Sequence, residues 1–148
     1  MFVSSGSVKF EVELTNRYIL FCRSKKLFQT LIYSHPAFQR VNEAHLRLGL
    51  IFEIEEEFES SLKHFKLALL DHSPCSLSSF EIRFRIARLH ETSGKPKLAK
   101  EFYEEIVKEK DLPVHLKADI NRQIGELGYL VLLLLKSCIF LSSVFGNS

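Results

Sequence analysis

Two stretches of the sequence decide the fold: HLRLGLIF at residues 45–52 and RFRIARLH at residues 83–90. Each is followed, after a short polar break, by a second helical pattern, FESSLKHFKLAL at 58–69 and PKLAKEFYEEIV at 96–107. The two pairs superpose at an offset of 38 residues. The matched positions are Leu48 with Ile86, Gly49 with Ala87, Ser61 with Ala99, Phe65 with Tyr103 and Ala68 with Ile106. A pattern that recurs in this way predicts a helical repeat.

Each repeat unit is predicted to be a pair of amphipathic helices. Gly49, Ser61 and Ala68 are small residues that let two helices approach closely. Phe52 and Phe65 recur at helical spacing and are placed to fill the space beside them.

Turn chemistry predicts where these helices end. Residues 55–57 separate the helices of the first unit, and residues 92–96 separate those of the second. In the second turn, Gly94 suits a helix C-terminus and Pro96 suits a helix start. The predicted helix-breaking links between units are residues 71–74 and 111–113.

The composition narrows the class of protein. The chain has 148 residues, of which 46% are hydrophobic and 26% charged, which fits one globular domain. Its 20 Lys and Arg against 18 Asp and Glu give a net charge of +2, too balanced for a dedicated DNA-binding domain. The three cysteines are odd in number and far apart, which predicts reduced thiols in an intracellular protein.

The pattern resembles a tetratricopeptide repeat array. Its small and large positions are matched by Leu48, Gly49, Phe52, Ser61, Phe65, Ala68 and, one place late, Pro74. The second unit departs from the pattern, because His90 replaces an aromatic residue and Ile106 replaces an alanine. The resemblance implies an all-α fold of helical hairpins stacked as a short right-handed superhelix.

The resemblance also implies a domain organisation. Residues 1–23 form a divergent N-terminal segment that lacks the first helix of a repeat, and residues 129–148 form an apolar C-terminal tail. Residues 24–128 form the repeats. The expected units are a partial unit at 24–37, full units at about 42–75 and 80–113, and a partial unit at 114–128.

A narrower resemblance concerns HLRLG at 45–49, SSLKHF at 60–65 and LAL at 67–69. These segments are similar to part of the repeat region of the UTX and UTY family of Jumonji-type demethylases of trimethylated lysine on histone H3. The resemblance implies a nuclear scaffold fragment that binds subunits of an MLL-type histone methyltransferase complex. Repeats of the yeast Cyc8-type co-repressor are related, and they remain an alternative.

No demethylase activity, metal or cofactor is expected of this chain. The family's catalytic domain binds iron through an H-x-D or H-x-E motif and a distant histidine. None of the six histidines has Asp or Glu two places later. The acidic cluster at 53–59 is interpreted as a solvated turn, and the basic residues at 83–100 are interleaved with acidic ones, so nucleic acid is not an expected partner.

Residues 129–145 form an apolar stretch of about 17 residues that Lys136 interrupts. We expect it to pack on the last repeat as a cap. A tail anchor in a membrane, on a tetratricopeptide adaptor, is the less favoured alternative.

The first helix of each unit should line a concave, partner-binding face. Leu46 and Leu50 stand where some tetratricopeptide proteins clamp a peptide carboxylate, so a peptide or helix with an apolar anchor and mixed charges is expected instead. The alternative is that Leu46, Leu50 and Phe84 only pack against neighbouring repeats. The predicted face comprises Glu43, Leu46, Leu50, Glu53, Glu81, Phe84, Arg88, Glu91 and Arg122, with Glu126 beside it.

Overall fold

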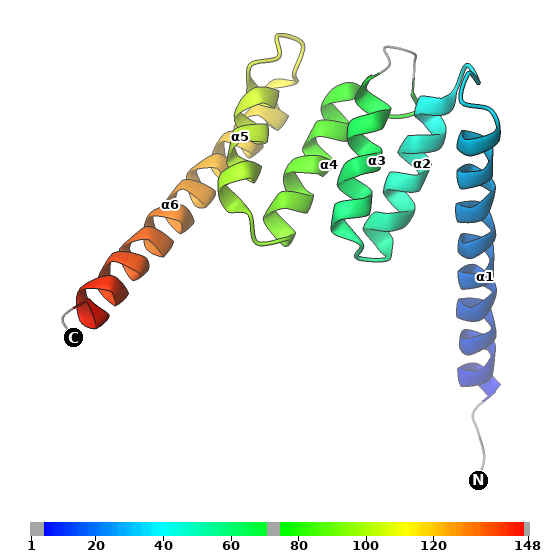
Figure 1. Cartoon of the computed structure of the whole chain (residues 1–148), viewed down its shortest axis with the longest axis horizontal. Helices are drawn as coiled ribbons and strands as arrows, with labels where there is room; N and C mark the ends of the chain where they lie inside the picture. The colour runs from blue at the N-terminus through cyan, green and yellow to red at the C-terminus, as the bar shows by residue number, and fades with distance from the viewer. Residues whose placement is uncertain (1–4, 71–74, 147–148) are drawn as a thin grey trace. The chain divides into compact units, whose positions relative to one another are not determined.

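A computed structural model describes residues 5–70 and 75–146, with the side chains of α1 described at residue 13 and from residue 17 onward. The described chain is all-α, as the sequence predicts, and its helices pack in consecutive pairs (Figure 1). The helices are α1 (Ser5–Ser34), α2 (Val41–Ile54), α3 (Phe58–Leu70), α4 (Ser79–Thr92), α5 (Pro96–Val107) and α6 (Val114–Phe145). They form two compact units, residues 1–76 with α1 to α3 and residues 77–148 with α4 to α6.

The first unit is built on a very close approach of α2 and α3 at Gly49. A Cβ atom on Gly49 would lie only 2.6 Å from Cδ1 of Phe65, so the ring occupies the space that a side chain would need. Ser61 is fully buried beside it and donates a hydrogen bond to the Gly49 carbonyl at 2.8 Å. The predicted turn at 55–57 is confirmed, with Glu56 at a φ of 60°.

The second unit repeats this arrangement with different side chains. Ala87 and Ala99 stand where Gly49 and Ser61 would fall, Tyr103 stands in place of Phe65, and all three are fully buried. The predicted turn at 92–96 is confirmed, because Gly94 has a φ of +73° and Pro96 begins α5. α6 begins directly after Pro113, as predicted, whereas the predicted link at 71–74 lies outside the described residues.

The expected boundary between residues 23 and 24 does not exist. α1 runs without a break from Ser5 to Ser34. The physical reason is that neither glycine nor proline occurs between residues 7 and 34, and the helix ends just before Pro36, which disfavours helical backbone at the preceding residue. The prediction that residues 1–23 lack a helix was therefore wrong for Ser5 onward.

The prediction that residues 129–145 cap the last repeat was also wrong. Ile120 and Leu127 of α6 pack against α5 in the core of the second unit, but the side chains from Leu132 to Phe145 are exposed. α5 has 12 residues and α6 has 32, so at about 1.5 Å per residue α5 can cover only part of α6. Figure 1 shows the second half of α6, orange to red, extending past α5.

α6 is also the one described helix that is long and apolar enough to cross a membrane by length and composition. Only 6% of its most apolar window is buried.

The close approach at Gly49 predicts opposite effects of the same substitution at two glycines. Gly49→Ala should lower the free energy of unfolding by about 1–2 kcal/mol, because crowding against Phe65 outweighs the better helix propensity of alanine. Gly125 has nothing within 4 Å of a built Cβ, so Gly125→Ala should raise stability by about 0.5–1 kcal/mol. Urea unfolding of both variants measures the difference. Equal effects at the two sites would contradict this packing.

Candidate partner-binding site

A hollow in the second unit brings together three of the predicted partner-binding residues. Glu81, Phe84 and Arg88 follow one another at helical spacing along α4 and line a cavity of about 300 Å³. We call it the α4–α6 hollow, because Leu116 and Ile120 of α6 form its other wall. The full lining is Leu77, Phe80, Glu81, Phe84, Arg85, Arg88, Leu116 and Ile120.

Phe84 gives the α4–α6 hollow a fixed apolar floor. Its ring packs edge-on against the buried Tyr103, with centroids 5.6 Å apart. Burial raises the pKa of Tyr103, and the neighbouring Glu91, which accepts a hydrogen bond from the Tyr103 hydroxyl at 3.2 Å, raises it further. Tyr103 is therefore a neutral packing residue, and Glu91 serves to hold it.

The charges of the α4–α6 hollow favour an anionic group on a ligand. The Glu81 carboxylate accepts hydrogen bonds from the Ser78 hydroxyl at 2.6 Å and the Ser78 N–H at 2.8 Å, which lower the pKa of Glu81. This carboxylate caps the start of α4 and is already engaged. Arg85 and Arg88 also line the hollow, so its cationic side chains outnumber its one acidic side chain.

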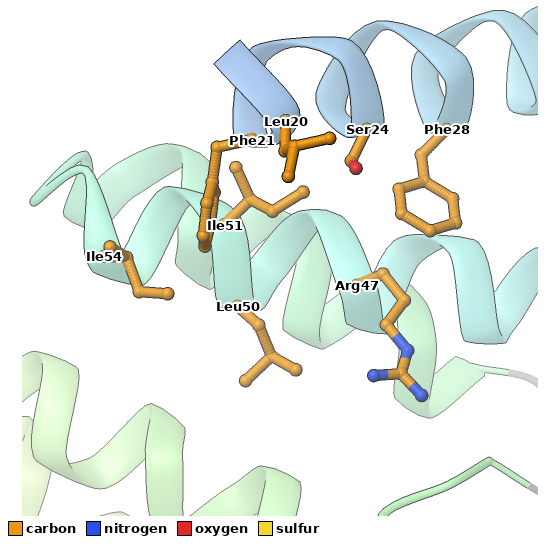
Figure 2. Close-up of a pocket in the computed structure, with 8 residues that line it drawn as sticks. All are labelled: Leu20, Phe21, Ser24, Phe28, Arg47, Leu50, Ile51 and Ile54. Atoms are coloured by element: carbon orange, nitrogen blue, oxygen red, sulfur yellow. The ribbon is translucent and has the colours of Figure 1, made fainter. Parts of the chain in front are cut away.

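A second hollow lies in the first unit, between α1 and α2, and has a volume of about 320 Å³. Figure 2 shows Phe21 and Phe28 pointing from α1 toward α2. Leu50 is the only predicted partner-binding residue among those that line it. The lining comprises Leu20, Phe21, Ser24, Phe28, Arg47, Leu50, Ile51 and Ile54. Sequence reasoning missed the α1 residues because it ended the repeat resemblance near residue 24.

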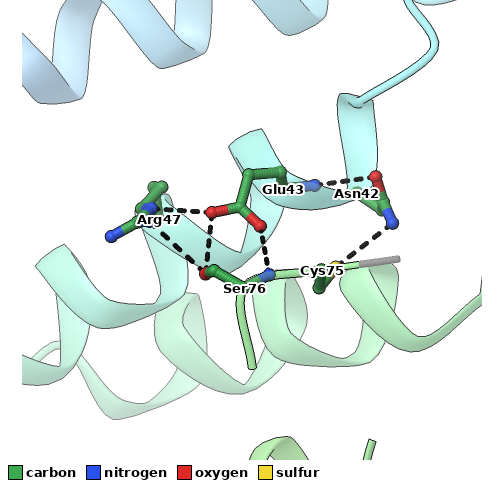
Figure 3. Close-up of polar contacts among 5 residues, drawn as sticks. All are labelled: Asn42, Glu43, Arg47, Cys75 and Ser76. Atoms are coloured by element: carbon green, nitrogen blue, oxygen red, sulfur yellow. Dashed lines mark hydrogen bonds and ion pairs between the residues drawn. The ribbon is translucent and has the colours of Figure 1, made fainter. Parts of the chain in front are cut away.

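Two predicted residues of α2 are used for structure. Leu46 is fully buried, so its prediction as part of an accessible face was wrong. Glu43 accepts hydrogen bonds from the N–H and hydroxyl of Ser76, both at 2.8 Å, and from Nε of Arg47 at 2.8 Å (Figure 3). Burial alone would raise the pKa of Glu43, but these bonds outweigh it and hold the pKa below its usual range. Asn42 adds a contact to Cys75 at 3.1 Å, so this cluster fastens the segment after α3 to α2.

The remaining predicted residues do not join either hollow. Glu53 is half-buried near the end of α2. Arg122 is exposed on α6 and donates to Glu126, one turn later, at 2.8 Å. The structure therefore gathers part of the predicted face in the second unit and leaves the rest dispersed.

The histidines serve packing in the described chain. His90 is buried and stacks on Phe102 with centroids 5.3 Å apart, as expected for an aromatic position. His45 and His64 face each other across α2 and α3 with their Nδ1 atoms 2.9 Å apart, and His64 also stacks on Phe52. Among the described residues no group of three or more His, Cys, Asp or Glu could hold a metal ion.

Comparison with known proteins adds no identification. No known protein-family model matches the chain, and no solved structure is significantly similar to it.

The facing histidines predict an acid-sensitive first unit. Burial lowers the pKa of His64 to about 4 and also lowers the pKa of His45, with Lys63 adding to both effects. The unfolded chain therefore takes up protons first as the pH falls, so stability is complete above pH 6.5 and is lost progressively between pH 6.5 and about 4.

Circular dichroism melts across this pH range measure the effect. His64→Phe, which keeps an aromatic ring against Phe52, should reduce the loss of melting temperature at acid pH. The same change at the exposed His115 is the matched control. A pH profile identical in His64→Phe and wild type would contradict the prediction.

Proposed function

We propose that the chain is a non-catalytic protein-interaction scaffold whose helical hairpins are tetratricopeptide-type repeats, stacked as a short right-handed superhelix. The offset of 38 residues supports this reading, because it relates α2 and α3 to α4 and α5 position by position. Gly49 with Phe65 and Ala87 with Tyr103 are equivalent under that offset, and each set includes a fully buried aromatic residue. The resemblance to the UTX and UTY repeat region supports a nuclear role, with subunits of an MLL-type methyltransferase complex as partners.

The α4–α6 hollow is the observation that carries this proposal. It is open to solvent, it has an apolar floor held by Tyr103, and two arginines line it. A peptide or helix that inserts one apolar side chain and presents a carboxylate beside it fits these features. The repeats of a Cyc8-type co-repressor would use a similar surface for other partners and remain the alternative.

Charge reversal in the hollow tests the proposal. The full chain, as wild type and as Arg88→Glu, is used to capture proteins from nuclear extract, and known methyltransferase-complex subunits are quantified by immunoblot. Arg88 is exposed, so the variant should keep the wild-type melting temperature. We expect about a tenfold loss of captured subunits, because a ligand carboxylate would then face a like charge.

Lys97→Glu provides the matched control, since Lys97 is an exposed cation on α5 away from the hollow. It should capture as much as wild type. Equal capture by wild type and Arg88→Glu, or no capture of these subunits by either, would contradict the proposal.

A further inference from the structure

The second half of α6 is apolar on every side. The exposed large hydrophobic residues there are Tyr129, Leu130, Leu132, Leu133, Leu134, Leu135, Ile139, Phe140, Leu141, Val144 and Phe145. Consecutive residues of a helix lie about 100° apart, so Leu132 to Leu135 alone point in all directions around the axis. The groove of a folded partner would cover only one face. A helix that is apolar all round is instead typical of a protein core or of a membrane.

The dimensions of this segment fit a lipid bilayer. Residues 129–145 span about 26 Å at 1.5 Å per residue, close to the roughly 30 Å of a bilayer's hydrocarbon layer. Arg122 and Glu126 lie before the segment, and Tyr129 stands at its start, where aromatic side chains suit the membrane–water interface. Charged and apolar surfaces are thus separated along α6.

The polar side chains within the segment are compatible with lipid. The Ser137 hydroxyl donates to the Leu133 carbonyl at 3.0 Å, and the Ser142 hydroxyl donates to the Ile139 carbonyl at 2.9 Å. These hydroxyls need no water, which is what a hydrocarbon environment requires. Lys136 is the one charged residue, and its long side chain tilts toward the Tyr129 end, which allows the ammonium group to reach toward the interface.

We propose that residues 129–145 of α6 insert across a lipid bilayer and hold the helical unit at the membrane surface as an integral membrane protein. This inference concerns a part of the chain distant in sequence from Arg88, and it stands whether or not the α4–α6 hollow binds a peptide.

The test uses the full chain synthesised in the presence of phosphatidylcholine vesicles, followed by flotation and alkaline carbonate extraction. Wild type should float with the vesicles and resist extraction. Leu133→Arg adds a second charge one turn before Lys136 and should lower the inserted-to-free ratio by about 100-fold. Lys136→Leu should raise that ratio. Leu98→Arg, at an exposed leucine of α5, is the matched control and should behave as wild type.

Three results would overturn the proposal. Wild type that floats but is released by carbonate lies on the surface and does not span. Wild type that remains soluble as an oligomer, and becomes monomeric with Leu133→Arg, uses a second copy of the chain to cover the segment. Insertion that is the same in wild type and Leu133→Arg does not depend on this segment.

Discussion

The contact between the backbone of Gly49 and the ring of Phe65 is the constraint on which the first unit depends. The ring lies where a Cβ would be, so α2 and α3 can approach only because position 49 has no side chain. The Ser61 hydroxyl then reaches the Gly49 carbonyl, and the faces of both helices close around the ring. In the second unit, Ala87 and Tyr103 occupy the same repeat positions and both are fully buried. Gly125, at the third such position, has no neighbour of this kind in the described chain, and α6 continues as an exposed helix.

Two glutamates at equivalent repeat positions illustrate a second shared constraint. Glu43 and Glu81 are 38 residues apart, and each lies in the first turn of its helix. Carboxylates are favourable there because free N–H groups give a helix N-terminus a partial positive charge. Glu43 accepts hydrogen bonds from Ser76, and Glu81 accepts them from Ser78, so both anchor the segment that precedes α4. Residues predicted to contact a partner thus carry structural roles, and ligand selectivity in the α4–α6 hollow would rest on Phe84 and its arginines.

Local chemistry made most helix ends predictable. Gly94, Pro96 and Pro113 each restrict the backbone where they stand, so the turns and the start of α6 could be placed from sequence. The α4–α6 hollow could be predicted in part, because Glu81, Phe84 and Arg88 share one face of α4. Leu46 could not be separated from Leu50 in this way, since a helical stripe does not reveal which of its residues a neighbour covers. The exposure of residues 132–145 was equally hidden, because an apolar sequence shows what must be covered and not what covers it.

The measurement that tests this account most directly is a double-mutant cycle between positions 49 and 65. The free energy of unfolding in urea is measured for wild type, Gly49→Ala, Phe65→Leu and the double variant. If the ring of Phe65 is what excludes a side chain at position 49, the smaller leucine relieves the crowding. The double variant should then be more stable than the sum of the two single effects by about 1 kcal/mol or more. Effects that add to within about 0.5 kcal/mol would contradict the close approach on which the hairpin is built.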